Sequence, residues 1–123
     1  MSKKVDSLIK KWQGHVFSTG SYIGEDYVKF QRQFRNALKE VAEDAGYTLH
    51  KFLGNHYCCS AVLKEKETGA FAYLSIPDVR GFPGHWAKDV LYRQMRHEGD
   101  WSGGVNHYAP LNELSDALRM LYR

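Results

Sequence analysis

Long apolar segments are absent from this sequence, and so are the short motifs of the common enzyme classes. No stretch approaches the roughly 20 consecutive apolar residues that a membrane-spanning helix requires, and the lysine-rich start is not followed by an apolar export segment. There is no Gly-x-Ser-x-Gly, no Walker loop, no His-Glu-x-x-His and no Gly-x-Gly-x-x-Gly after a strand. We therefore expect a cytoplasmic protein without a membrane partner, and no motif indicates an enzyme.

Cysteine is scarce, and a strong excess of charge is lacking. The two cysteines are the neighbours Cys58 and Cys59, which cannot close a useful disulfide loop, so the pair agrees with a reducing compartment. The net charge of +3 and the pI near 8.8 are too weakly basic to indicate a nucleic-acid-binding protein by themselves. They are compatible with a partner that has an acidic surface.

What the chain does contain is enough apolar material for one core. Its 123 residues are 43% hydrophobic and 14% aromatic, which fits a single domain spanning residues 1–123. Apolar residues recur at helical spacing between Val5 and Trp12, and glycines follow. We expect residues 1–24 to form a short terminal helix and a connection, and residues 25–123 to form the core.

The clearest helical pattern runs from Glu25 to Ala45. Gly24 is placed to cap the start of this helix, and Gly46 is placed to end it. Glu43 and Asp44 near its C-terminus oppose the helix dipole, and the local sequence offers no reason for them. The expected apolar face comprises Tyr27, Phe30, Phe34, Ala37, Leu38, Val41 and Ala45, and the expected basic face comprises Lys29, Arg32, Arg35 and Lys39.

From Tyr47 onward the apolar period changes from helical to alternating, which indicates β-strands. Strands are predicted over Tyr47–Leu53, His56–Lys64 and Ala70–Ile76, with a fourth over Val90–Arg96. Gly54-Asn55 suits a two-residue hairpin turn, because a type II′ turn has glycine first. The predicted fold class is α+β: an antiparallel sheet of three to four strands with a long N-terminal-side helix and a C-terminal helix packed on it.

The Gly54-Asn55 turn places Leu53 opposite His56 and so assigns side chains to the two faces of the sheet. The face predicted to pack on the long helix is mostly aliphatic and comprises Tyr47, Leu49, Leu53, Cys58, Val62, Ala72, Leu74 and Ile76. The other face is aromatic and comprises His50, Phe52, Tyr57, Cys59, Leu63, Phe71 and Tyr73. A final helix that starts at Pro110 is expected to cover part of this aromatic face; its apolar stripe comprises Leu111, Leu114, Leu118 and Leu121.

The stretch His97–Tyr108 is the principal candidate site. Its three glycines disfavour a regular element, since glycine in an element interior costs roughly 0.5–1 kcal/mol relative to alanine. A shaped loop is therefore expected, and Trp101 gives it a side chain suited to contact another molecule. The alternative is a structured surface loop whose Asp100 and Asn106 only satisfy their own backbone.

A zinc site is one alternative function for the histidines and cysteines, because imidazole and thiolate are the usual zinc ligands. Cys58 and Cys59 project to opposite faces of a strand, so both cannot bind one ion without a bulge. No cofactor other than zinc is indicated. The candidate ligands are His56, Cys58, His85, His97 and His107.

A hydrolase is a second alternative. In that case His107 is the general base, and Asp100 orients it or holds a divalent ion. A nucleophile built from Cys59 with His50 as its base is a further variant. The other polar loop residues of this hypothesis are Asp78, Arg80 and Asn106.

A nucleic-acid-binding module is the third alternative. A helix followed by three antiparallel strands and a final helix resembles the order of a double-stranded-RNA-binding domain. The final helix, however, offers Asn112, Glu113 and Asp116 in place of the expected basic cluster, and its two carboxylates repel phosphates. The candidate stacking residues are Phe52, Tyr57, Phe71 and Tyr73.

Several short motifs together resemble small proteins that mobile elements and phages of Gram-positive bacteria encode. The motifs are His56-Tyr57, Tyr73 ahead of Asp78-Val79-Arg80, and Asp100–Tyr108, and the resemblance spans roughly residues 25–123. Such proteins include anti-CRISPR proteins, which are compact inhibitors that bind an effector nuclease and catalyse no reaction. Many of these inhibitors are strongly acidic DNA mimics, a pattern from which this basic chain departs. The resemblance therefore implies contact with the protein surface or guide RNA of an effector.

The expected function is that of a non-enzymatic inhibitor in the cytoplasm of a host bacterium. Its expected partner is a protein effector, such as a CRISPR nuclease or the nuclease with its guide RNA. Aromatic and arginine side chains dominate the energetics of protein interfaces. The expected partner-binding residues are Trp101, Tyr108, Trp86, Arg80, Lys29 and Arg32.

Overall fold

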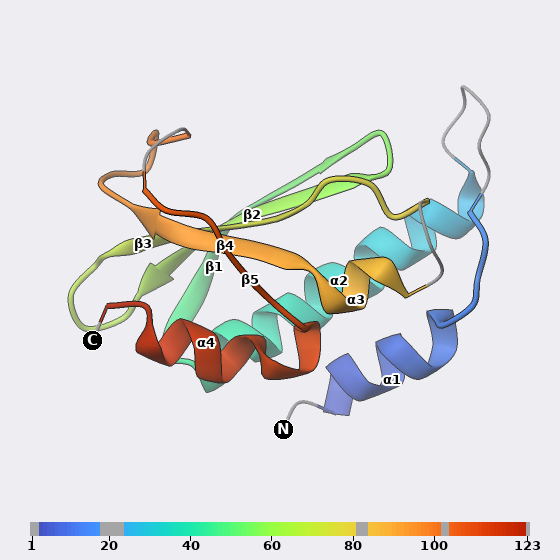
Figure 1. The fold of residues 1–123 in the computed structure, drawn as a ribbon, viewed down its shortest axis with the longest axis horizontal. Helices are drawn as coiled ribbons and strands as arrows, with labels where there is room; N and C mark the ends of the chain where they lie inside the picture. The colour runs from blue at the N-terminus through green and yellow to red at the C-terminus, as the bar shows by residue number, and fades with distance from the viewer. Residues whose placement is uncertain (1–2, 18–23, 81–83, 102–103, 123) are drawn as a thin grey trace.

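The computed structural model describes residues 3–17, 24–80, 84–101 and 104–122 and has the expected α+β class (Figure 1). Residues 18–23 of the predicted connection and residues 102–103 of the candidate loop lie outside this description. In chain order the elements are α1 (Lys3–Trp12), α2 (Glu25–Asp44), β1 (Tyr47–Asn55), β2 (Cys58–Glu65), β3 (Phe71–Ile76), α3 (His85–Lys88), β4 (Val90–Met95), β5 (His107–Ala109), the 3-10 turn η1 (Leu111–Glu113) and α4 (Leu114–Met120).

The long helix α2 forms as its sequence predicts. Gly24 is its N-cap in an extended conformation, and Glu25 and Asp26 occupy its first turn, where carboxylates favour the positive end of the helix dipole. Gly46 follows its C-terminus with a φ of +83°, a left-handed conformation that glycine adopts without steric cost. Among the described residues no helix is long and apolar enough to cross a bilayer.

The sheet has five antiparallel strands in the order β1-β2-β3-β4-β5, one more than the predicted three to four. The additional strand, β5, pairs Ala109 with Val90 and Tyr108 with Leu91. It contains three residues, and the first two lie within the segment His97–Tyr108 expected to be a loop. Three residues are too few to display an alternating pattern, so local sequence does not predict this strand.

The first hairpin reverses at His56-Tyr57, and the predicted turn at Gly54-Asn55 is wrong. Asn55 pairs with Cys58, so β1 runs two residues beyond its predicted end. Tyr57 adopts a φ of 57°, which is uncommon for a residue other than glycine. Its buried ring lies 4.6 Å from that of Tyr27, and its hydroxyl accepts a 3.0 Å hydrogen bond from the backbone N–H of Gly24. These tertiary contacts hold a turn that the glycine pattern does not favour.

A β-bulge at His50 changes the faces of the sheet. Leu49 pairs with Leu63, but the next paired residue is Lys51, which lies opposite Val62. The bulge inverts the alternation in the second half of β1, so the face predictions for that segment and for β2 are wrong. The residues that face the helices instead of the open side are Phe52, Cys59 and Leu63, and those that face the open side are Leu53, Cys58 and Val62.

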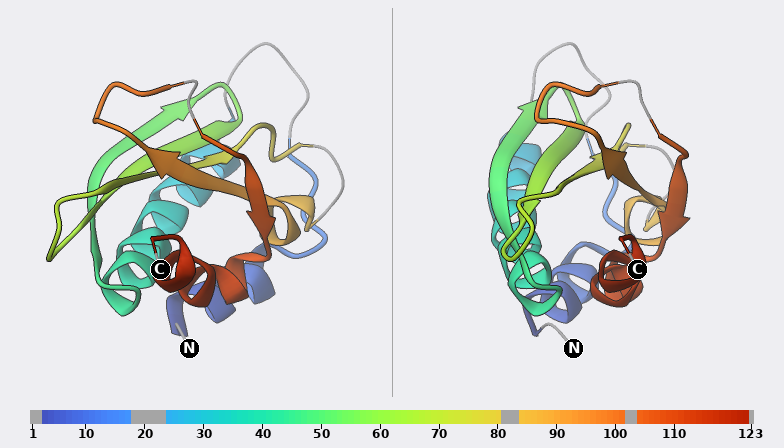
Figure 2. Two further views of the ribbon diagram at one scale, coloured as in Figure 1. Left: turned by 60° about the vertical axis from the view of Figure 1, so that its left-hand side comes forward. Right: turned by 90° about the vertical axis from the view of Figure 1, so that its left-hand side faces the viewer.

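The helices lie together on one side of the curved sheet (Figure 2). The expectation that the C-terminal helix covers the aromatic face is wrong, because Leu114 and Leu118 of α4 belong to the same core as α2. The Tyr47 hydroxyl donates to the Leu118 carbonyl at 3.3 Å, and Ser115 donates to the carbonyl of Val41. On the opposite side of the sheet no described helix packs, and the loop between β4 and β5 lies there instead.

Candidate protein-binding surface

The face of the sheet that points away from the helices is called the outer face. Its central side chains form a row of hydroxyl groups. Tyr73 donates a hydrogen bond of 3.2 Å to the Ser60 hydroxyl, which lies 3.4 Å from the hydroxyl of Ser75. The row gives the outer face a polar surface beside aromatic rings, unlike the apolar helix side. The members of the outer face used below are Ser60, Val62, Phe71, Tyr73, Ser75, Leu91, Arg93, Met95 and Tyr108.

Residues 96–101 cross the outer face from β4 back to β1, and we call them the strap. One Glu98 carboxylate oxygen lies 2.8 Å from Nζ of Lys51 and 3.2 Å from Nε2 of His50. Both partners reach the same carboxylate because the bulge places two consecutive residues on one face. Figure 2 shows the strap, in orange, close to β1 before the chain returns to β5. The strap therefore reaches across the sheet from β4 to β1, and Val62 on the outer face of β2 is fully buried.

A buried arginine and a buried aspartate hold the returning part of the strap. Arg93 is 3% exposed, its guanidinium lies 4.8 Å from the Tyr73 ring centre, and it donates to the carbonyl oxygens of Asp100 at 2.8 Å and Gln94 at 3.1 Å. Asp100 is 5% exposed, and its carboxylate accepts hydrogen bonds from the backbone N–H and Nε of Arg96. This network fixes the position of the residue that follows, Trp101.

Trp101 and Tyr108 present the largest exposed rings of the outer face. Trp101 is 51% exposed and packs edge-on against the Tyr73 ring at 5.9 Å between centroids. Tyr108 is 61% exposed and lies opposite Leu91, one strand beyond β4. Both side chains are thus accessible to a partner, which the prediction that they bind one requires. Their rings and the hydroxyl row form a surface that combines aromatic contact with hydrogen-bonding groups.

The ion pairs of Glu98 predict a dependence of stability on pH. Lys51 and then His50 lower the pKa of Glu98 from its usual value of 4.5, because both favour the carboxylate. A lowered folded pKa adds stability well above pH 4.5, and that contribution is lost as the pH falls through the folded pKa. We expect Glu98→Gln to be less stable than the wild type at pH 7, with a deficit that shrinks as the pH falls below 4.5, measured by urea denaturation at pH 7 and pH 3. The exposed Glu67→Gln is the control, and an equal Glu98→Gln deficit at both pH values contradicts the assignment.

Trp86 was expected to contact a partner, and this expectation is wrong. Its side chain is 1% exposed and lies in the core, where its ring packs against Phe30 at 4.9 Å between centroids. It belongs to α3, a helix of four residues whose other buried residue is Ala87. A single helical turn has too few residues to show which side is apolar, so the sequence pattern does not reveal the burial of Trp86.

Arg80 and the cations of α2 are not brought together with Trp101. The strap leaves β4 beside Phe71 at the start of β3, whereas Arg80 follows the end of that strand. Arg80 lies over the Tyr57 ring and donates to both Asp78 oxygens, and these hydrogen bonds lower the pKa of Asp78. Lys29 and Arg32 belong to α2, which packs on the helix side. The predicted partner-binding residues thus divide among separate regions.

The candidate zinc ligands are also spread over the molecule. In the part of the chain that the structure describes, no three histidine, cysteine, aspartate or glutamate side chains lie close enough to hold a metal ion. Cys58 donates a hydrogen bond to the Pro77 carbonyl, and His85 pairs with Asp89 at 3.2 Å. In the strap, Nδ1 of His97 accepts the N–H of Gly99. The His107 ring stacks on Tyr92 instead of facing these groups.

The residues of the hydrolase hypothesis have other partners. His50 reaches the outer face while Cys59 faces the core, so the bulge separates this possible base from its nucleophile. Burial raises the pKa of the Cys59 thiol to about 11, which disfavours the reactive thiolate. Asp100 binds Arg96, and these bonds do not link it to His107.

Sequence reasoning missed Glu98 and Arg93, which fix the strap. Arg93 does carry a signal, because a charged residue interrupts the apolar side chains at the centre of β4. His50-Lys51 carries another, since two polar residues in succession break the alternation of β1 at the bulge. Glu98 has no such signal, because its partners lie far from it in the sequence.

No protein-family model, no curated protein and no solved structure matches this chain. The fold and the surface therefore define its class: an α+β protein whose five-stranded sheet has helices on one side and a strapped aromatic face on the other.

Proposed function

We propose that this protein is a non-enzymatic inhibitor that binds a protein partner through the outer face. The proposed partner is a CRISPR effector nuclease, a target that the sequence resemblance implies. The observation that carries the proposal is the exposure of Trp101 and Tyr108 on the one sheet face that the described helices leave open. Exposed tryptophan and tyrosine side chains are the residues most enriched at the energetic centres of protein interfaces.

The fixed position of Trp101 supports this proposal. Binding immobilises side chains and loops at a cost of about 0.5–1.5 kcal/mol per flexible side chain. In this structure the strap is held by Glu98 at one end and Arg93 at the other, and Trp101 already rests on Tyr73. Because Trp101 is ordered before contact, binding costs less conformational entropy, and more of the free energy of apolar contact appears as affinity.

The polar groups beside Trp101 also favour a protein partner. Specific interfaces combine apolar anchors with hydrogen bonds, about one for each 100–200 Å² of buried area. The hydroxyl groups of Tyr73, Ser60 and Ser75 lie beside the aromatic rings and supply such donors and acceptors. The outer face thus offers both kinds of contact.

The test is a DNA-cleavage assay with the guide-loaded effector nuclease of the host, incubated with increasing amounts of this protein. We expect wild-type protein to stop cleavage near one molecule per nuclease, because a binder acts stoichiometrically and a hydrolase acts at far lower amounts. The double variant Trp101→Ala/Tyr108→Ala is expected to need at least tenfold more protein, equivalent to about 1.4 kcal/mol.

The matched control removes two exposed apolar side chains elsewhere. Val28→Ala/Met120→Ala alters α2 and α4, which pack on the helix side. The control is expected to inhibit like the wild type. Cleavage that wild-type protein leaves unchanged overturns the proposed target, and equal inhibition by both double variants overturns the proposed surface.

A further inference from the structure

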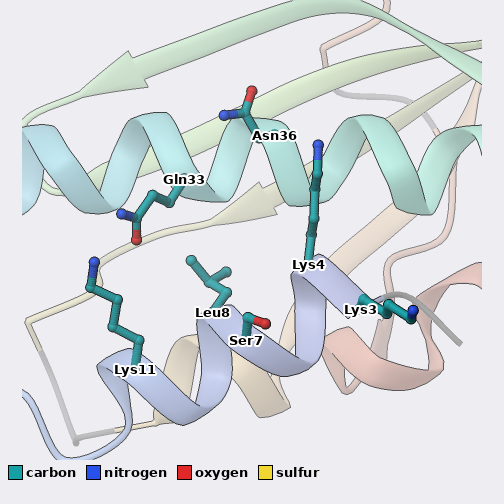
Figure 3. Close-up of a pocket in the computed structure, with 7 residues that line it drawn as sticks. All are labelled: Lys3, Lys4, Ser7, Leu8, Lys11, Gln33 and Asn36. Carbon is teal, nitrogen blue, oxygen red and sulfur yellow. The ribbon is translucent and has the colours of Figure 1, made fainter.

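A groove of about 370 Å³ lies between α1 and α2, on the helix side of the sheet (Figure 3). The polar side chains among its lining residues are ammonium, amide and hydroxyl groups, and Leu8 packs between the two helices. Figure 3 shows the Lys11 side chain extending toward Gln33, and Lys4 extending toward α2. The lining residues are Lys3, Lys4, Ser7, Leu8, Lys11, Gln33 and Asn36.

Like charges meet at one end of this groove. The pKa of Lys11 is lowered, first by partial desolvation of its exposed side chain and second by the neighbouring ammonium of Lys29. Two ammonium groups that repel each other favour an anion placed between them. The end of the groove near Lys11 is therefore the position where the two ammonium groups stabilise a bound anion most strongly.

The positive charge continues along the exposed face of α2. Lys29, Arg32, Asn36 and Lys39 are spaced by three or four residues and so lie on one stripe. The ten helical steps from Lys29 to Lys39 span roughly 15 Å at 1.5 Å per step. Arg35 lies one turn from Arg32 and Lys39 and widens this stripe. We call the groove and the stripe together the basic surface.

The acidic residues of α2 do not neutralise this charge, because most of them are paired elsewhere. Within the described part of the chain, the cations of the stripe make no ion pair with a carboxylate. Asp26 pairs with His15, Glu43 with Lys66 and Asp44 with Arg119, and the Glu40 carboxylate accepts a hydrogen bond from the backbone N–H of Lys4. The net charge of +3 is thus unevenly distributed, and the basic surface carries an uncompensated share of it.

We propose that the basic surface binds the phosphate backbone of a nucleic acid. Arginine, lysine, amide and hydroxyl side chains supply most phosphate contacts in protein complexes with nucleic acids, and these groups make up the basic surface. The described parts of α1 and α2 expose no aromatic ring, and Val28 is the one large apolar side chain that they expose, so the cluster of aromatic anchors typical of a protein interface is missing there. None of the residues that make up the basic surface is aromatic, so the surface offers the bases no stacking platform.

The proposal is tested by fluorescence anisotropy with labelled 20-nucleotide single strands and duplexes of RNA and DNA, titrated between 50 and 200 mM salt. We expect binding that weakens steeply with salt, because neutralised phosphates release counterions. Lys11→Gln/Lys29→Gln is expected to lower the affinity at least tenfold at 50 mM salt. It should also reduce the slope of log affinity against log salt by roughly 1.4–1.8, which is about 0.7–0.9 for each lost contact.

The matched control, Lys64→Gln/Lys88→Gln, removes the same charge from exposed positions outside the basic surface. It is expected to bind within twofold of the wild type, and circular dichroism checks that both variants fold. Wild-type affinity weaker than about 100 μM for all four nucleic acids at 50 mM salt overturns the proposal. An equal loss in both double variants overturns the assigned surface, and binding of polyglutamate without binding of nucleic acid overturns it in favour of an acidic protein.

Discussion

Trp86→Ala is expected to lower the free energy of unfolding by about 3–5 kcal/mol, the range for truncating a buried aromatic side chain. The Trp86 ring is almost fully enclosed and packs on Phe30, so its removal takes away apolar contact and leaves a cavity. Stabilities of single domains are about 5–15 kcal/mol, so this loss is a large fraction of the total. Urea denaturation followed by circular dichroism gives the difference.

Two further variants keep this expectation testable if Trp86→Ala fails to fold. Trp86→Phe retains most of the apolar contact and is expected to lose less. Trp101→Ala removes the same side chain from an exposed position and is expected to change stability by less than about 1 kcal/mol. Equal losses for Trp86→Ala and Trp101→Ala contradict the burial of Trp86.

Arg93→Met is expected to lower the free energy of unfolding by about 2–4 kcal/mol. Methionine retains much of the apolar stem but removes the donors that bind the carbonyl oxygens of Asp100 and Gln94. Each buried acceptor left without a donor costs about 1–3 kcal/mol. The strap is expected to open more often, which hydrogen exchange of the backbone amides in residues 96–101 measures.

The control for Arg93→Met is Arg96→Met, three residues along the chain. The Arg96 side chain is exposed and makes one hydrogen bond to Asp100, and the bond from its backbone N–H survives the substitution. Its loss is expected to stay below about 1 kcal/mol, as for other exposed ion pairs. Similar losses for the two variants, or unchanged exchange in the strap of Arg93→Met, rule out the anchoring role of Arg93.

The first hairpin shows where prediction from local sequence ends. The alternation that starts at Tyr47 identifies β1 and β2, but glycine at position 54 indicates a turn two residues too early. The conformational preference of a glycine turn contributes less free energy than the burial of Tyr57, whose ring packs on Tyr27 and whose hydroxyl binds the backbone of Gly24 at the start of α2. Those partners are distant in the sequence, and so the position of the turn depends on the fold.

The candidate site divides in the same way. The glycines and aromatic residues after His97 indicate a shaped loop with an exposed Trp101, and the structure has both. That this loop crosses the sheet depends on Glu98 meeting Lys51 and His50, which the bulge turns to the same side. Local sequence does not predict these ion pairs, because Glu98 and its partners are far apart in the chain.

Local sequence patterns predict the elements whose periodicity extends over several turns or residues: the helix α2, with its glycine ends, and strands β1 to β4. Only the tertiary structure decided the faces of β1 and β2, the burial of Trp86 and the partners of charged residues. Glu43 and Asp44 oppose the dipole of their own helix, yet they pair with Lys66 and Arg119 from other elements. Periodicity is a property of neighbouring residues, whereas packing and charge pairing join residues that only the folded chain brings together.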